Sequence, residues 1–82
     1  MGWKKHLCKF FIDMDLGVAI ESNSKLLGRW ATIDDWCRDN IPAGRIWYSE
    51  YILVESSRFV RYWFESNEDL MAFKLVWGEY EN

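Results

Sequence analysis

The chain has 82 residues, a length that suits one domain with a thin hydrophobic core. Half of the residues are hydrophobic and 18% are aromatic, which is too apolar for an intrinsically disordered chain. The formal net charge of −3 argues against a general nucleic-acid binder, because such proteins neutralise phosphates with clustered Lys and Arg. We therefore expect a single domain over residues 1–82 that does not bind nucleic acid.

Alternating apolar residues near the start of the chain predict a strand over about residues 5–15. Alternate side chains of a strand point to opposite faces, so one face is expected to join the core. The expected core face carries Cys8, Phe10, Ile12 and Met14. Phe11 falls on the other face, where a polar residue would be ordinary, so the second face of this strand is unusual from the outset.

The helical pattern that follows has two interpretations. Apolar residues recur at helical spacing at Leu26, Leu27, Trp30, Ile33, Trp36, Cys37 and Ile41. One long helix, with Ser24 as its N-cap, would contain Gly28, which costs roughly 1 kcal/mol relative to Ala in a helix interior. The alternative begins the helix at Ile33, with Thr32 as N-cap and Asp35 completing a capping box. Both interpretations predict a helix over residues 33–40, which Pro42 and Gly44 end.

Two further strands are predicted over about residues 45–55 and 58–65, joined by Ser56-Ser57 as an antiparallel hairpin. The first of them is apolar on both faces. One face carries Ile46, Tyr48, Ile52 and Val54, and the other carries Trp47, Tyr51 and Leu53. In the second strand, Phe59 and Trp63 point away from the face formed by Val60, Tyr62 and Phe64.

A second helix is predicted after this hairpin. Ser66 or Asn67 can N-cap it, and Ser66 with Asp69 has the spacing of a capping box. The apolar stripe consists of Leu70, Phe73 and Trp77, widened by Met71 and Val76. Gly78 follows the stripe, at the position where a glycine commonly ends a helix.

The element order β-α-β-β-α predicts an α+β fold. A three-stranded antiparallel sheet would carry both helices on one face, as in a ferredoxin-like fold without its last strand. The expected core contains Phe10, Ile12, Trp36, Tyr62, Phe64, Phe73 and Trp77.

The second face of such a sheet should be polar, but the sequence places aromatic residues on or near it. These residues are Phe11, Trp47, Tyr51, Phe59 and Trp63. One explanation is that a bulge changes the faces, or that residues 16–31 cover them. The other is an exposed aromatic patch, which is typical of a protein interface. We take these five residues as the predicted interface.

Candidates for chemistry are few. Asp13 and Asp15 could hold Mg²⁺ at a strand end, but they lack a third ligand. His6 and Cys8 share a strand face and could form a Cys–His pair, although no oxyanion-hole signature accompanies them. We therefore expect a protein that is not an enzyme and that has no metal site or cofactor.

The two cysteines, Cys8 and Cys37, fall at core positions of predicted elements. Free buried thiols in a reducing compartment are the expected state. The longest apolar runs are too short to span a membrane, so no membrane partner is expected.

Two segments carry a family resemblance: Trp36-Cys37-Arg38-Asp39-Asn40 on the first helix and the terminal helix EDLMAFKLVWG at residues 68–78. The chain resembles small proteins of tailed bacteriophages, especially those of marine bacteria and cyanobacteria, over about residues 30–78. The resemblance implies the β-α-β-β-α order and a location in the cytoplasm of an infected host cell, but no particular activity.

Together with the small size, acidity and aromatic surplus, this resemblance favours a binding protein that inhibits or redirects a host protein by covering its surface. The alternative is a self-associating structural or accessory protein of the virion. A small metal-dependent enzyme using Asp13 and Asp15 is the third hypothesis.

Overall fold

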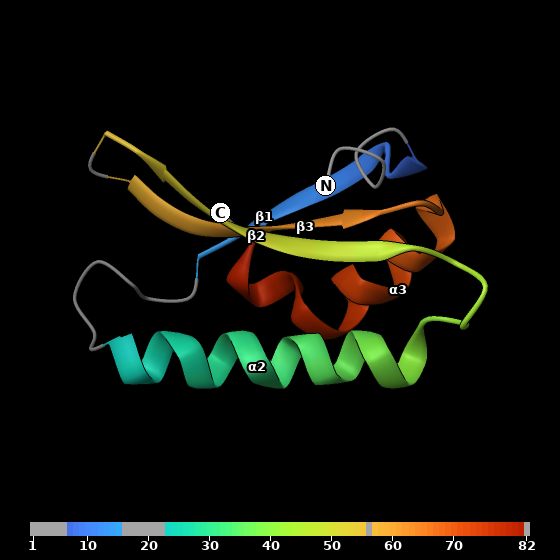
Figure 1. Cartoon of the computed structure of the whole chain (residues 1–82), viewed down its shortest axis with the longest axis horizontal. Helices are drawn as coiled ribbons and strands as arrows, with labels where there is room; N and C mark the ends of the chain where they lie inside the picture. Colours follow the sequence, from blue (N-terminus) through green and yellow to red (C-terminus); the bar gives the residue numbers. More distant parts are fainter. Residues whose placement is uncertain (1–6, 16–22, 56, 82) are drawn as a thin grey trace.

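The computed structural model describes residues 7–15, 23–55 and 57–81. Its elements are β1 (Phe10–Met14), α2 (Asn23–Asn40), β2 (Trp47–Val54), β3 (Ser57–Phe64), α3 (Asn67–Trp77) and the short 3₁₀ helix η1 (Gly78–Tyr80). This order confirms the predicted β-α-β-β-α arrangement. Figure 1 shows α2 and α3 on the same side of the sheet, so the molecule has a helix layer packed on one sheet face.

The sheet is antiparallel throughout, with strand order β1-β3-β2. The central strand β3 pairs with β1 only between residues 60 and 64, whereas its pairing with β2 continues to Val54 opposite Ser57. The outer part of the β2–β3 hairpin therefore extends beyond β1 (Figure 1). Residues 55 and 56 connect the strands, and Glu55 has the positive φ of 54° that tight hairpin turns favour.

The first strand is shorter than predicted. Of the expected range, residues 5 and 6 lie outside the described part of the chain, and residues 7–9 do not belong to a strand. The pairing begins only at Phe10, which lies opposite Phe64. Cys8 is nevertheless buried, as its core position predicted.

The single long helix is the correct interpretation for α2, which has 18 residues, although it begins at Asn23 and so contains Ser24, the expected N-cap. Thr32 does not begin a helix. Its hydroxyl Oγ1 donates to the carbonyl oxygen of Gly28 at 2.9 Å, one turn back, so the helix continues through it. Ile33 and Cys37 then face the core and are fully buried. No helix among the described residues is long and apolar enough to cross a membrane.

Helix α3 begins as predicted, because the Ser66 side chain accepts a hydrogen bond from the Glu68 backbone N–H at 3.2 Å. Asp69 does not complete a capping box, since its Oδ2 lies 3.0 Å from Nε of Arg45 in an ion pair. The predicted glycine stop is only partly right. Gly78 keeps a right-handed φ of −60° and continues into η1 instead of reversing the chain.

The core lies between the sheet and the helices. Its buried residues are Ile12, Met14, Ile33, Cys37, Ile41, Val60, Tyr62, Phe64 and Phe73. Two predicted core residues, Trp36 and Trp77, pack against this cluster but are only partly buried. Phe10 is 37% exposed because it is the first residue of an edge strand.

Met71 and Val76 do not widen the core stripe of α3, contrary to the prediction, and both are exposed. At 100° per residue they lie about 90–130° around the helix from the line through Leu70, Phe73 and Trp77. The stripe that contacts the sheet is therefore narrow, and the rest of the helix surface faces away from the core.

Candidate functional site

The pairing register decides which side chains share a face of the sheet. Residues of β1 and β2 that lie opposite even-numbered residues of β3 share the face of Val60, Tyr62 and Phe64, which the helices cover. We call the opposite face the second face; neither α2 nor α3 covers it (Figure 1). Its strand residues are Phe11, Asp13, Tyr48, Glu50, Ile52, Val54, Phe59, Arg61 and Trp63.

Trp47 and Tyr51 do not belong to the second face, so the prediction was wrong for both. Trp47 lies opposite Phe64 and packs against the core, and the Tyr51 ring lies 6.2 Å from the ring of Trp30 on α2. The reason is the two-residue hairpin connection, which sets odd-numbered residues of β2 opposite even-numbered residues of β3. Tyr48 takes their place on the second face.

Phe11, Phe59 and Trp63 do lie on the second face, but their exposure differs. Phe11 is 47% exposed and Trp63 is half-buried, whereas Phe59 is only 9% exposed. Phe59 sits on the central strand, where the Arg61 guanidinium carbon lies 5.7 Å from its ring centroid. Phe59 thus supports its neighbours and offers little surface to a partner.

Three aromatic rings form a row across all three strands of the second face. The ring centroids of Phe11 and Trp63 are 4.9 Å apart, and those of Trp63 and Tyr48 are 5.9 Å apart with an interplanar angle of 10°. The indole Nε1–H of Trp63 also donates to Oε1 of Glu50 at 2.7 Å. Because stacking and a hydrogen bond both hold it, the Trp63 ring is fixed in one orientation.

Arg61 completes the second face. Its Nε and Nη2 atoms donate to the two carboxylate oxygens of Asp13 at 2.6 and 3.2 Å. The guanidinium carbon lies 4.4 Å from the centroid of the Phe11 ring, within cation–π distance. The hydrogen bond to Asp13 raises the pKa of Arg61 above its ordinary value, so the guanidinium stays charged at neutral pH.

This ion pair bears on the predicted magnesium position at Asp13 and Asp15. The Asp13 carboxylate is engaged by Arg61 on the sheet, and Asp15 is an exposed residue just beyond the end of β1. Within residues 7–15, 23–55 and 57–81, no group of three or more His, Cys, Asp or Glu side chains is arranged to hold a metal ion.

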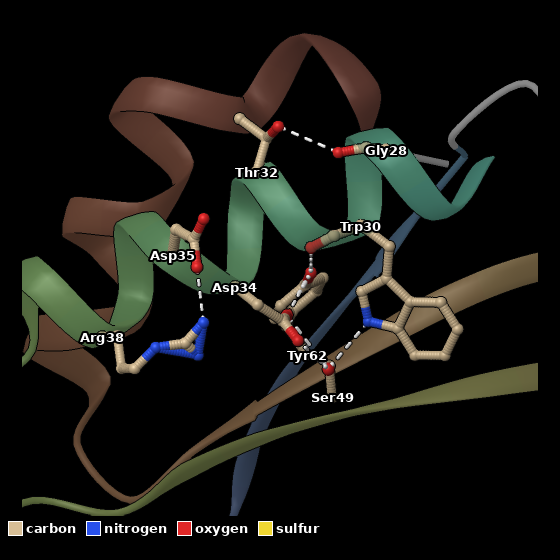
Figure 2. A network of polar contacts seen from close by, with 8 residues as sticks. All are labelled: Gly28, Trp30, Thr32, Asp34, Asp35, Arg38, Ser49 and Tyr62. Carbon is tan, nitrogen blue, oxygen red and sulfur yellow. Dashed lines mark hydrogen bonds and ion pairs between the residues drawn. The ribbon is translucent and has the colours of Figure 1, made fainter. Parts of the chain in front are cut away.

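A separate polar network lies on the helix-covered face and joins α2 to the sheet. Figure 2 shows Asp34 accepting hydrogen bonds from the Tyr62 hydroxyl at 2.7 Å and from the Ser49 hydroxyl at 3.1 Å. Trp30 Nε1 donates to Ser49 Oγ at 2.9 Å. Burial, followed by the bond to Asp34, raises the pKa of Tyr62 well above its ordinary value, so its hydroxyl remains a donor. The network fixes how α2 sits on β2 and β3.

The surroundings of the Cys37 thiol disfavour its ionised form. Burial, with Asp34 nearby, raises the pKa of Cys37 to about 12, so its thiol is neutral at physiological pH. Both Cys37 and Cys8 are buried, as predicted, and Cys8 Sγ lies 3.6 Å from the Ile46 carbonyl oxygen. The hypothetical Cys–His pair involves His6, which lies outside the described residues.

In comparisons with known proteins, no family model, curated protein or solved structure matches the chain. The structure itself defines a small α+β domain with a three-stranded antiparallel sheet. Its distinguishing feature is the second face, where Tyr48, Glu50 and Arg61 join the predicted Phe11 and Trp63. Sequence reasoning could have found Tyr48, since any two-residue hairpin connection sets odd against even residues.

Proposed function

We propose that the chain is a small binding protein that covers a surface of another protein with its second face. The observation that carries this proposal is the Phe11–Trp63–Tyr48 row, which is fixed in place yet not under either described helix. The resemblance to phage proteins supplies the class of target, a host protein that is inhibited or redirected in the cytoplasm of the infected cell.

The residue types on the second face, and the fixed positions of their side chains, suit such a role. Trp, Tyr and Arg are enriched among the residues that contribute most to binding in protein interfaces. Because Trp63 and Arg61 are already held by Glu50 and Asp13, binding would cost little side-chain entropy. The half-exposed ring of Phe11 would gain burial on contact.

The charge of the second face favours an apolar contact over an ionic one. Its described strand residues carry two carboxylates, Asp13 and Glu50, and one cation, Arg61, which leaves a formal charge of −1. Asp13 and Arg61 neutralise each other, and Glu50 is bonded to Trp63. The partner is therefore expected to present an apolar surface, with at most one basic group near Glu50.

The experiment compares two charge insertions at exposed apolar positions. Phe11→Glu places a carboxylate on the second face, and Leu27→Glu places one on α2, where Leu27 is 57% exposed. Each tagged variant is used to capture proteins from a host-cell lysate, with mass spectrometry to identify them. We expect one stoichiometric host protein that is captured by the parent and by Leu27→Glu but not by Phe11→Glu. Equal capture by both variants would refute the second face as the contact.

A second candidate function, self-association, is favoured by the outer edge of β2. This strand has eight residues without Pro or Lys, and no described residue pairs with its free edge. Leu53 and Val54 near its end are 59% and 54% exposed. The other edge is partly covered, because Met14 of β1 bridges to Glu81. An uncovered edge of this kind can pair with the same strand of another copy.

Sedimentation at increasing concentration separates the two functions. If copies join through β2, Leu53→Lys will abolish association and Phe11→Glu will leave it intact, since charge on an edge strand prevents pairing. A protein that stays monomeric at all concentrations supports the host-binding role instead.

A further inference from the structure

The hydrogen bonds of the hairpin determine which backbone groups of β2 point to its outer edge. The Glu65 backbone N–H donates to the Ile46 carbonyl oxygen at 3.0 Å, one position beyond the Trp47–Phe64 pair. Hydrogen-bonded pairs alternate along antiparallel strands, so the even-numbered residues of β2 direct their backbone N–H and C=O groups toward β3. The odd-numbered residues direct theirs outward, where no strand among the described residues pairs with them. These residues are Trp47, Ser49, Tyr51 and Leu53.

A second copy of the chain suits this edge better than a lone extended peptide. On the helix-covered side of the edge, Tyr51 and Leu53 are 41% and 59% exposed. A lone peptide strand would bring no layer to pack beneath these side chains. A second copy would bring its own α2, which is held under β2 by the hydrogen bond from Trp30 to Ser49 (Figure 1). Pairing between copies would therefore occupy the backbone groups of the edge and cover its apolar side chains together.

Strand overlap and charge select one register for such a pair. Two antiparallel copies related by a two-fold axis set one residue of β2 opposite itself. The longest overlaps pair residues 47–53 about Glu50 or residues 48–54 about Tyr51. An axis at Glu50, the one charged residue of β2, would bring two carboxylates face to face, and like charges directly opposite each other destabilise a sheet. An axis at Tyr51 sets Glu50 opposite Ile52 of the second copy instead.

We propose that two copies pair antiparallel through β2 with Tyr51 opposite Tyr51 of the second copy. Ser49 then lies opposite Leu53 of the second copy, and these pairs form about six backbone hydrogen bonds. On the second face, Val54, which is 54% exposed, lies opposite Tyr48 of the second copy. This inference rests on the self-association through β2 proposed above and adds its register.

The register has a consequence for the second face. Even-numbered residues of the two β2 strands lie opposite each other, so both second faces lie on the same side of one continuous sheet. The dimer therefore presents the Phe11–Trp63–Tyr48 row twice on one surface. A partner with two equivalent sites is held by both rows at once, and such two-site binding is tighter than binding to one row.

Disulfide cross-linking at introduced cysteines tests the register. In the proposed dimer, Tyr51→Cys places two thiols on Cα atoms about 5.5 Å apart, within the range of a disulfide. We expect this variant to form a linked dimer under mild oxidation, seen on a non-reducing gel. The parent is the control and should not link, because Cys8 and Cys37 are buried.

Two charge insertions show whether the link depends on β2. Adding Leu53→Lys to Tyr51→Cys should abolish the linked dimer, since charge on an edge strand prevents pairing. Adding Leu75→Lys is the matched control, because Leu75 lies on α3 and is 89% exposed, and the link should remain. Cross-linking that survives Leu53→Lys would overturn pairing through β2.

A mixture of two variants tests the competing register. An axis at Glu50 would set Ser49 opposite Tyr51 of the second copy, so size-tagged Ser49→Cys mixed with Tyr51→Cys would give a mixed disulfide. We expect the Tyr51→Cys dimer and no mixed product. A mixed product that forms faster than the Tyr51→Cys dimer would overturn the register but leave self-association in place. A parent that sediments as a monomer, with no link in Tyr51→Cys, would overturn both and leave the host-binding role.

Discussion

The two faces of the sheet both carry aromatic residues but use them differently. On the helix-covered face, Tyr62 and Phe64 contact Phe73 and are fully buried. On the second face, the rings of Phe11, Trp63 and Tyr48 make contacts at similar distances, yet they stay partly exposed. The aromatic content of a strand therefore does not distinguish core from surface; the elements packed over it do.

The polar groups show the same contrast. On the helix-covered face, Asp34 of α2 accepts hydrogen bonds from the sheet residues Tyr62 and Ser49. The positions of these two sheet side chains therefore depend on the helix packed over them. On the second face, the Asp13–Arg61 pair and the Glu50–Trp63 bond each join neighbouring strands. The polar contacts of this face are thus made within the sheet, without either described helix (Figure 1).

The largest expected effect is a difference in the free energy of unfolding between alanine variants of one aromatic residue on each face. Phe64→Ala should lower the free energy of unfolding by about 3–5 kcal/mol, because it leaves a cavity in the core. Phe11→Ala should cost about 1 kcal/mol or less, because the ring is already half in water. Urea denaturation measures both. Similar losses would show that the second face is part of the folding core.

The next effect is alkaline destabilisation from the helix-covered face. Burial, then Asp34, raises the pKa of Cys37 from 9.0 to about 12, and burial also raises the pKa of Tyr62. The folded protein keeps protons that the unfolded chain releases. Stability should be fully present below about pH 9 and should fall as the pH rises toward 12.

Urea unfolding across this range, with the thiols kept reduced, measures the loss. Cys37→Ala should lessen the loss between pH 9 and 10, where Tyr62 does not yet contribute, because an unfolded tyrosine titrates near pH 10. Unchanged stability of the parent up to pH 11 would be inconsistent with these two buried groups.

A smaller effect is expected for the network that joins α2 to the sheet. Tyr62→Phe removes one hydrogen bond to Asp34 while keeping the ring, so the free energy of unfolding should fall by about 1–2 kcal/mol. Tyr51→Phe is the matched control, since Tyr51 is 41% exposed, and it should cost no more than about 0.5 kcal/mol. Equal losses in the two variants would show that the Asp34 network does not stabilise the helix position.

The smallest expected effect is that of removing divalent metal. Asp13 is held by Arg61, and the described residues offer no set of three ligands. A chelator should therefore leave the melting temperature unchanged, whereas a structural metal site would contribute directly to folding. A drop of many degrees in the melting temperature would indicate that Asp13 and Asp15 bind a metal ion.

Much of the fold was predictable because local signals agreed with it. Strand and helix periods gave the element order, and Ser66 marked the start of α3 as predicted. Thr32 left two interpretations of the first helix open, because a threonine hydroxyl can cap a helix or bond back to the preceding turn. Only the packing of Ile33 and Cys37 decides between them. Gly78 misled because a glycine permits a left-handed stop without requiring one.

The candidate site was less predictable because it depends on contacts between strands. Trp47 and Tyr51 were assigned to the wrong face, although the hairpin connection alone would have corrected them. The ion pair between Asp13 and Arg61 joins residues 48 positions apart, so no local sequence pattern predicts it. The burial of Phe59 likewise depends on contacts that form only when the strands of the sheet have paired.

The most direct test of the second face as a contact surface is hydroxyl-radical footprinting with residue-level mass spectrometry. The protein is labelled alone and in the complex with its captured partner. We predict that oxidation of Phe11 and Trp63 falls in the complex, while that of Tyr51, which lies on the helix-covered face and is 41% exposed, stays the same. Protection of Tyr51 with unchanged labelling of Phe11 and Trp63 would contradict the account.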